Sequence, residues 1–82
     1  MSVYDEINAE RERQDEQWGR EHDEAARVSH FERLIPKYVE EAFKARMRTG
    51  NHDMTDWRRR MVQVAALAVA ALETEDRRHA AA

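Results

Sequence analysis

The sequence has no cysteine, one proline and two glycines, and each of these shortages excludes a class of structure. Without cysteine the chain has no disulfide framework and no thiolate nucleophile. Few prolines and glycines, with no alternation of apolar and polar residues, leave strands little support, whereas good helix formers are abundant. The sequence therefore predicts an all-α fold.

Large apolar residues are also scarce. Leu, Ile, Val and Phe together number 13 of the 82 residues, and alanine alone supplies another 13. This composition approaches that of disordered chains, but the net charge of −3 is small and the larger apolar residues cluster along the chain. We expect one small domain, residues 1–82, whose thin core is completed by oligomerisation.

Targeting segments and common catalytic motifs are missing as well. Residues 1–6 lack the pattern of a signal peptide, and no apolar run approaches the length of a membrane span, so we expect a soluble, cytoplasmic protein. The chain has no Gly-rich phosphate loop, and its four histidines lack metal-ligand spacing. His22, Asp23 and His30 could bind a transition metal, but solvated histidines are the favoured interpretation.

The first helix is expected over residues 2–18. Ser2 can serve as its N-cap, and Asp5 and Glu6 place acids in the first turn, where the helix dipole favours negative charge. Gly19 is a natural stop.

The second helix is expected over residues 30–48, after a polar loop at 19–29 that has no helical period. Ser29 and Glu32 have the spacing of a capping box, and Gly50 closes the helix. Pro36 removes one backbone hydrogen bond, so we expect either a kink there or a helix that restarts at the proline.

The third helix is expected over residues 55–78, with 79–82 as a frayed tail. Within it, residues 61–72 contain only one polar side chain, Gln63, so the helix is apolar on nearly every side. One partner helix cannot cover such a segment, which is too short to span a membrane. The prediction is a homo-oligomeric helical bundle, dimer or tetramer, whose subunits bury residues 61–72 between them.

Two segments resemble a known family. The pattern I-x-x-E-R-x-x-Q-D-x-x-W-G is carried by Ile7, Glu10, Arg11, Gln14, Asp15, Trp18 and Gly19, and a second similar segment covers residues 60–69. Both resemble the small, phage-type members of the all-α nucleoside triphosphate (NTP) pyrophosphohydrolase superfamily, also called MazG-like. The resemblance spans about residues 3–78 and implies a single MazG-like domain, located in the host cytoplasm if phage-encoded.

In that family the second helix carries Glu-Glu-x-x-Glu and the third carries Glu-x-x-Asp, and these acids hold Mg²⁺ against the nucleotide. The preferred register assigns these five positions to Lys37, Tyr38, Glu41, Arg60 and Gln63. Only Glu41 is then an acid. The resemblance therefore implies a degenerate metal site, with no cofactor expected.

A second register is open, in which Glu40 and Glu41 are the leading acids and Lys44 takes the third position. Under either register Arg60 and Gln63 replace both acids of the third helix. The conclusion of a degenerate site does not depend on the choice.

Two interpretations of this site compete. In the favoured one, Glu41 pairs with Lys37 one turn away and with Arg60 across the helix interface, so that ion pairs replace the metal. In the other, Lys37 and Arg60 leave a pocket for phosphate without magnesium.

The N-terminal motif also has two interpretations. Its polar residues can form a buried network that fixes the first helix, or they can contact a nucleobase on which Trp18 stacks; the polar residues are Glu10, Arg11, Gln14 and Asp15. Trp18 and Trp57 are more often core or interface anchors than nucleobase platforms.

A basic patch gathers around the predicted turn between the second and third helices. It consists of Lys44, Arg46, Arg48, Arg58 and Arg59, next to Arg60. Because the whole chain is acidic, with a pI near 5.8, an acidic partner protein is favoured over nucleic acid.

Three functions follow as hypotheses. The first is a non-catalytic relative of the pyrophosphohydrolases that binds a partner protein, such as a host enzyme or defence system, or a nucleotide. The second is a Mg²⁺-dependent enzyme that releases nucleoside monophosphate and pyrophosphate with Glu40, Glu41 and either Glu73 or Asp76. The third is a magnesium-independent nucleotide-binding module in which Lys37 and Arg60 hold phosphates.

Overall fold

The computed structural model describes residues 2–18 and 24–81, which form three α-helices. The helices are α1 (Val3–Trp18), α2 (Glu24–Thr49) and α3 (Thr55–Ala81). Within these described ranges there is no strand, which confirms the all-α prediction. None of the described helices is long and apolar enough to cross a membrane.

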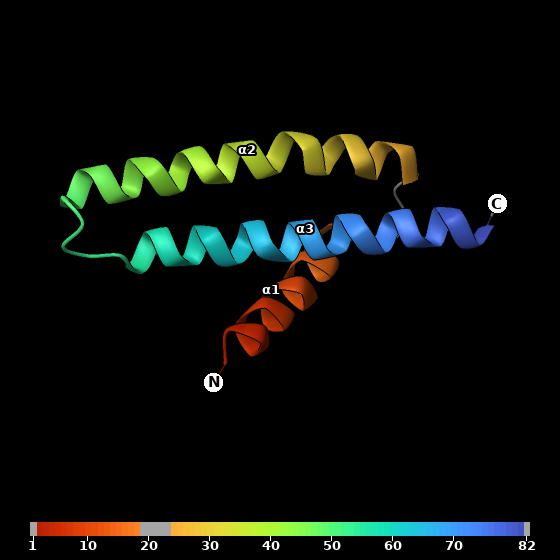
Figure 1. Cartoon of the computed structure of the whole chain (residues 1–82), viewed down its shortest axis with the longest axis horizontal. Coiled ribbons are helices and arrows are strands. Elements are labelled where there is room, and N and C mark those ends of the chain that lie inside the picture. The colour runs from red at the N-terminus through yellow and green to blue at the C-terminus, as the bar shows by residue number, and fades with distance from the viewer. Residues whose placement is uncertain (1, 19–23, 82) are drawn as a thin grey trace.

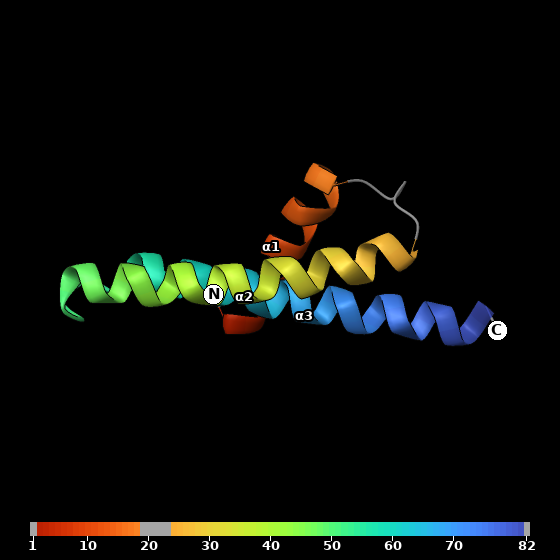
Figure 2. The same ribbon diagram turned by 90° about the horizontal axis from the view of Figure 1, so that it is seen from above.

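The helices are arranged as an antiparallel pair with a third helix across it. Helices α2 and α3 run side by side, and α1 crosses α3 (Figure 1). The view from above shows the same arrangement, with α1 inclined steeply to the pair (Figure 2). The molecule is elongated, 48 × 27 × 20 Å.

Ser2 caps α1 as predicted. Its hydroxyl accepts a hydrogen bond from the Asp5 amide at 3.1 Å, and its own amide donates to the Asp5 carboxylate at 3.1 Å. This reciprocal pair satisfies two amides that a helix N-terminus leaves without partners. The first turn is thereby anchored by residues close together in the sequence.

The predicted start of the second helix is wrong. Helix α2 begins at Glu24 and not at residue 30, so Ser29 lies inside the helix and the Ser29–Glu32 capping box is not used. Residues 24–28 are mostly strong helix formers, and half-buried Val28 lies one turn before buried Phe31. His22 and Asp23 lie outside the described residues.

Pro36 does not restart the helix, because α2 runs through it as one element. The proline deprives the Glu32 carbonyl of its helical partner. Both Pro36 and Glu32 are exposed, so water can hydrate that carbonyl. Pro36 thus lies on the exposed side of α2, where the loss of this backbone hydrogen bond destabilises the helix least.

A left-handed turn ends α2 at the expected place. Gly50 has φ 60° and Asn51 has φ 70°, and the amide of Asn51 donates to the Arg46 carbonyl at 3.2 Å. The amide of Gly50 donates to the Met47 carbonyl at 3.4 Å, which completes a Schellman motif. This turn reverses the chain into α3.

The start of α3 matches the prediction, but its end does not. The Asp53 carboxylate accepts a hydrogen bond from the Thr55 amide at 3.0 Å, and α3 then continues to Ala81 instead of ending at residue 78. The residues expected as a frayed tail extend the helix as far as Ala81 because alanine has the highest helix propensity.

The core is as thin as the composition indicates. Its buried apolar residues are Phe31, Ala42, Ala45, Ala66 and Leu67. Three of these five are alanines, which allow α2 and α3 to approach closely but bury little area. The polar contacts between helices therefore matter more than usual to the packing.

Candidate functional site

Arg60 of α3 is the centre of a polar cluster between α2 and α3. Its Nη2 lies 3.1 Å from Glu41 Oε2, and its Nη1 donates a hydrogen bond to Gln63 Oε1 at 3.0 Å. The guanidinium carbon lies 5.3 Å from the centre of the Tyr38 ring, a cation–π distance. We call Tyr38, Glu41, Arg60 and Gln63 the Arg60 cluster.

The spacing along the two helices explains the cluster. Tyr38 and Glu41 are three residues apart on α2, and Arg60 and Gln63 are three apart on α3, so each pair shares one helix face. These four residues occupy four of the five positions that the family resemblance assigns to metal ligands. The packing of α2 on α3 brings them together.

The cluster is partly withdrawn from solvent and electrically balanced. The side chains of Arg60 and Glu41 are 28% and 33% exposed, and their charges cancel. Glu41 Oε2 itself is buried and accepts no hydrogen bond of good geometry, so its attraction to Arg60 is mainly electrostatic. Across residues 2–18 and 24–81, no three His, Asp or Glu side chains form a group that could hold a metal ion.

Lys37 does not join the cluster. It is exposed, and it forms no ion pair with any described residue, so the predicted Lys37–Glu41 pair is wrong. Glu41 pairs with Arg60 instead. An ion pair at the half-buried interface between α2 and α3 is less screened by solvent than an ion pair with an exposed lysine. In the second register, Glu40 pairs with Lys44 at 3.4 Å on the outer surface of α2.

Two residues of the N-terminal motif form the predicted buried network. The side chain of Gln14 donates to Glu10 Oε2 at 2.9 Å and to the Gln63 carbonyl at 3.4 Å. Gln14 is only 3% exposed. Through Gln63, α1 is therefore attached to the Arg60 cluster.

Arg13 belongs to this network, although it lies outside the motif. Its Nε donates to Glu10 Oε1 at 2.9 Å, and this hydrogen bond raises the pKa of Arg13. The three-residue spacing of Glu10 and Arg13 on a helix could have identified the pair from the sequence.

The remaining motif residues are dispersed. Arg11 forms an ion pair with Glu73 of α3, and Asp15 is exposed. The Trp18 side chain lies outside the part of the structure that is described. Its predicted roles, as a core or interface anchor or as a platform for a nucleobase, therefore stay untested. Glu73 lies about 20 Å along α3 from Arg60, so neither it nor Asp76 is brought to Glu41.

The basic patch divides into two groups. A pocket of about 220 Å³ is lined by Glu41, Lys44, Ala45, Arg48, Asp56, Arg59 and Arg60, with a formal charge of +2. We call it the basic pocket. Arg46 instead donates to the Asn51 side chain at 3.1 Å and covers the Phe43 ring, and Arg58 pairs with Glu6 of α1 at 3.0 Å.

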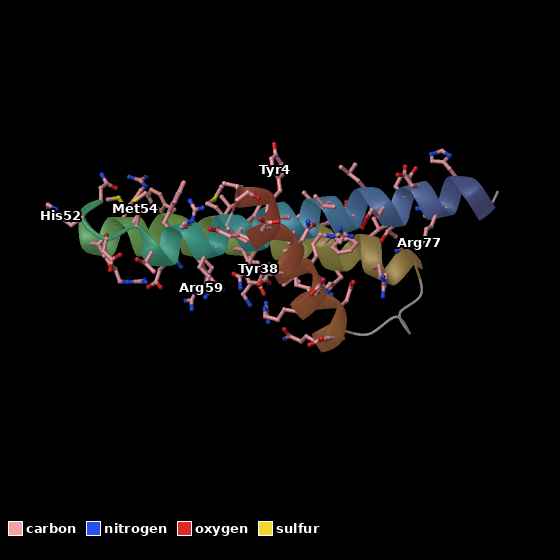
Figure 3. The ribbon with its side chains drawn as sticks, turned by 90° about the horizontal axis from the view of Figure 1, so that it is seen from below. Tyr4, Tyr38, His52, Met54, Arg59 and Arg77 are labelled. Atoms are coloured by element: carbon pink, nitrogen blue, oxygen red, sulfur yellow. The ribbon has the colours of Figure 1, made fainter. Side chains whose placement is uncertain are left out.

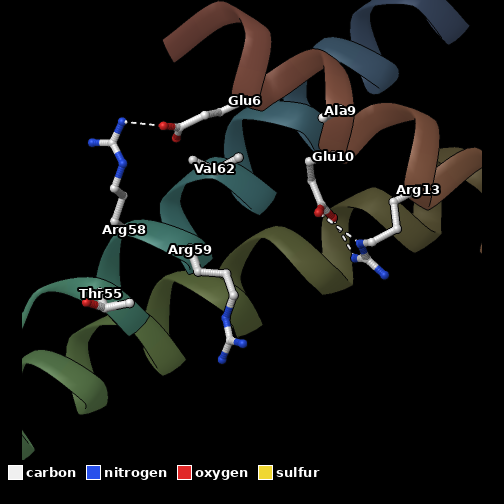
Figure 4. Close-up of a pocket in the computed structure, with 8 residues that line it drawn as sticks. All are labelled: Glu6, Ala9, Glu10, Arg13, Thr55, Arg58, Arg59 and Val62. Carbon is white, nitrogen blue, oxygen red and sulfur yellow. Dashed lines mark hydrogen bonds and ion pairs between the residues drawn. The ribbon is translucent and has the colours of Figure 1, made fainter. Parts of the chain in front are cut away.

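A second pocket, of about 500 Å³, lies between α1 and α3 (Figure 4). It is lined by Glu6, Ala9, Glu10, Arg13, Thr55, Arg58, Arg59 and Val62. Its acids are already paired, Glu6 with Arg58 and Glu10 with Arg13. Arg59 borders both pockets and projects on the same side of the molecule as Tyr38 (Figure 3). Sequence reasoning missed this pocket because it arises from the packing of α1 on α3.

Protein-family models, curated proteins and solved structures were each compared with the chain, and none matches it. Membership of the MazG-like superfamily therefore stays an interpretation of the two motifs. A proposal about function therefore has to be argued from the geometry of the Arg60 cluster and of the basic pocket.

Proposed function

We propose that this chain is a non-catalytic relative of the MazG-like NTP pyrophosphohydrolases that acts by binding a partner protein. The Arg60 cluster is the observation that supports the proposal. At positions where the resemblance expects acids, a guanidinium lies 3.1 Å from the one remaining carboxylate.

This arrangement opposes metal binding in the cluster. Mg²⁺ needs several oxygen ligands at about 2.0–2.1 Å, and Glu41 is the only carboxylate in the cluster. A metal at Glu41 would have to displace Arg60 and leave its charge without a counter-ion in a half-buried place. The acids of the enzyme hypothesis do not compensate, because Glu73 lies far along α3 and is paired with Arg11.

The basic pocket indicates what kind of partner is bound. Its volume of about 220 Å³ is below the roughly 300–1,000 Å³ of most small-molecule sites, yet four cationic side chains line it. A single carboxylate side chain from a partner fits these dimensions and charges. We therefore propose an acidic protein surface as the partner, and the phage-type resemblance makes a host enzyme or defence protein the proposed class of target.

Magnesium-independent nucleotide binding is the second candidate. Arg48 lines the basic pocket and forms no ion pair with any described residue, so it is available to a phosphate. Arg60 is held by Glu41 at a half-buried place, whereas the ion pairs of Lys44 with Glu40 and of Arg59 with Asp56 are exposed. Phosphates would therefore contact Arg48 together with Lys44 and Arg59, in place of the Lys37 and Arg60 pair that the sequence suggested.

Isothermal titration separates the candidates. We expect an oligoglutamate peptide to bind and Arg48→Glu to abolish that binding, whereas the matched charge reversal Arg78→Glu, at the far end of α3, leaves it unchanged. Titration with nucleoside triphosphates, with and without magnesium, is expected to show no binding. Pyrophosphate release in the presence of magnesium would overturn the proposal, and magnesium-independent nucleotide binding that Arg48→Glu removes would establish the second candidate.

A further inference from the structure

A carboxylate bound in the basic pocket leaves the larger pocket between α1 and α3 empty. We call this larger pocket, of about 500 Å³, the α1–α3 pocket. Its volume lies within the roughly 300–1,000 Å³ of most ligand sites, whereas the basic pocket is smaller than that range. The α1–α3 pocket therefore has room for a larger group than a carboxylate.

Apolar groups contribute most of the surface of the α1–α3 pocket. Ala9 of α1 and Val62 of α3 line it, and the arginine side chains around them add their aliphatic carbons. In the basic pocket, by contrast, Ala45 is the one apolar residue among those that form the lining. The two pockets therefore suit different chemical groups.

The acids at the α1–α3 pocket are already neutralised. Glu6 pairs with Arg58 at 3.0 Å, and Glu10 pairs with Arg13. Figure 4 shows one of these ion pairs on each side of Val62. A carboxylate from a ligand would meet the like charges of Glu6 and Glu10, which is unfavourable. The pocket therefore favours an uncharged apolar group over a second carboxylate.

An aromatic ring suits the α1–α3 pocket better than an aliphatic side chain. Guanidinium groups stack on aromatic rings, and three arginines line the pocket. The chain makes this contact elsewhere, between Arg60 and Tyr38 and between Arg46 and Phe43. Aromatic side chains that fill pockets are also frequent among the residues that dominate binding energy.

Arg59 connects the two pockets, because its side chain borders both of them. Its ion pair with Asp56 is exposed, with 3.4 Å between the charged atoms, and its guanidinium points away from the two ion pairs of the α1–α3 pocket (Figure 4). The near edges of the pockets are thus within the length of one arginine side chain. In an extended peptide, residues two positions apart project to the same side and lie about 7 Å apart. One short segment can therefore fill both pockets.

We infer that the partner is recognised through two side chains of one segment, a carboxylate in the basic pocket and an aromatic ring in the α1–α3 pocket, two residues apart. This inference rests on the proposed function, which supplies the carboxylate site. It adds the chemistry of the partner, which is an acidic segment with an aromatic residue within it and not a uniformly acidic surface.

Isothermal titration with three peptides tests this inference. Each has the sequence Glu-Glu-Gly-X-Gly-Glu-Glu, in which X is tryptophan, serine or glutamate and a glutamate stands two residues from X on either side. The tryptophan peptide is expected to bind at least about tenfold more tightly than the serine peptide, because a large aromatic side chain is buried. The glutamate peptide is expected to lack this gain, because acids already line the α1–α3 pocket.

The variant Ala9→Trp tests whether the gain arises in the α1–α3 pocket. Ala9 is exposed and lines the pocket, so the variant is expected to fold and to fill the pocket with its own ring. The tryptophan and serine peptides should then bind equally. Asn8→Trp is the matched control, because Asn8 is exposed and is not among the residues that line either pocket, and it should keep the gain. Circular dichroism verifies that both variants are helical.

Three results would overturn this inference and leave the proposed function intact. They are equal affinity of the tryptophan and serine peptides, equal gains from tryptophan and glutamate, and a gain that Ala9→Trp keeps or that Asn8→Trp also removes. If none of the peptides binds, or if Arg48→Glu leaves their binding unchanged, the proposed function fails and this inference fails with it. The two failures are therefore distinguishable.

Discussion

Arg60 Nη2 lies 3.1 Å from Glu41 Oε2, and this contact joins the two longest helices at their half-buried interface. Gln63 and Tyr38 complete the surroundings of the guanidinium. The Arg60 guanidinium therefore places a permanent positive charge of the chain itself at the interface between α2 and α3. The contact is therefore central both to the stability of the α2–α3 pair and to the proposed loss of metal chemistry.

Replacement of Arg60 by alanine is expected to destabilise the protein. The change leaves the Glu41 carboxylate partly buried without its partner, which costs about 1–2 kcal/mol of unfolding free energy after allowance for solvent screening. Urea denaturation at a fixed protein concentration measures the loss. The control is Arg59→Ala, whose ion pair with Asp56 is exposed and whose removal should change little. Equal effects of the two variants would contradict the structural role of Arg60.

Gln14→Leu is expected to weaken the attachment of α1. The variant keeps the side chain's bulk but removes the donor to Glu10 and to the Gln63 carbonyl, at a cost of about 1–2 kcal/mol. Gln17→Leu is the matched control, because Gln17 is exposed and, among the residues that the structure describes, its side chain accepts a hydrogen bond from Arg13 alone. Hydrogen exchange of the α1 amides reports the change directly. Unaltered protection of α1 in Gln14→Leu would refute the role of this network.

Gly50→Ala is expected to destabilise the turn between α2 and α3 by about 1 kcal/mol. The cause is the left-handed backbone, with φ 60°, since an added Cβ would lie an ordinary 3.8 Å from the His52 ring. The neighbouring change Asn51→Gly, at φ 70°, is the control and should be neutral or stabilising. Thermal unfolding of both variants checks the prediction, which fails if Gly50→Ala melts like the wild type.

Asp53 is expected to make stability depend on pH in the acid range. The hydrogen bond from the Thr55 amide lowers the pKa of Asp53 below its ordinary value of 3.8. A carboxyl group with a lowered folded-state pKa stabilises the protein above the unfolded value, and this contribution is lost as pH falls through the folded value. The difference in urea midpoint between wild type and Asp53→Ala should therefore be constant from neutral pH to about 5 and shrink below 3.8. A difference that grows on acidification would contradict this assignment.

Local signals determined much of the secondary structure. Ser2 with Asp5, the Gly50 turn and Asp53 are capping interactions between near neighbours in the chain, so the sequence alone places them. The start of α2 could not be placed in this way. Val28 and Phe31 are held in the helix by packing, and this packing outweighs the capping box that Ser29 and Glu32 offered in the sequence.

The sequence by itself determined that the fold is all-α, that the core is small and that an arginine stands where the resemblance to the MazG-like family expects an acid. Only the tertiary structure decided which charges pair between different helices. Glu41 pairs with Arg60 and not with Lys37, and Arg58 pairs with Glu6 of α1. Helix periodicity specifies the face on which a side chain lies. The approach of another helix determines how much of that face is desolvated, and the strength of an ion pair depends on that desolvation.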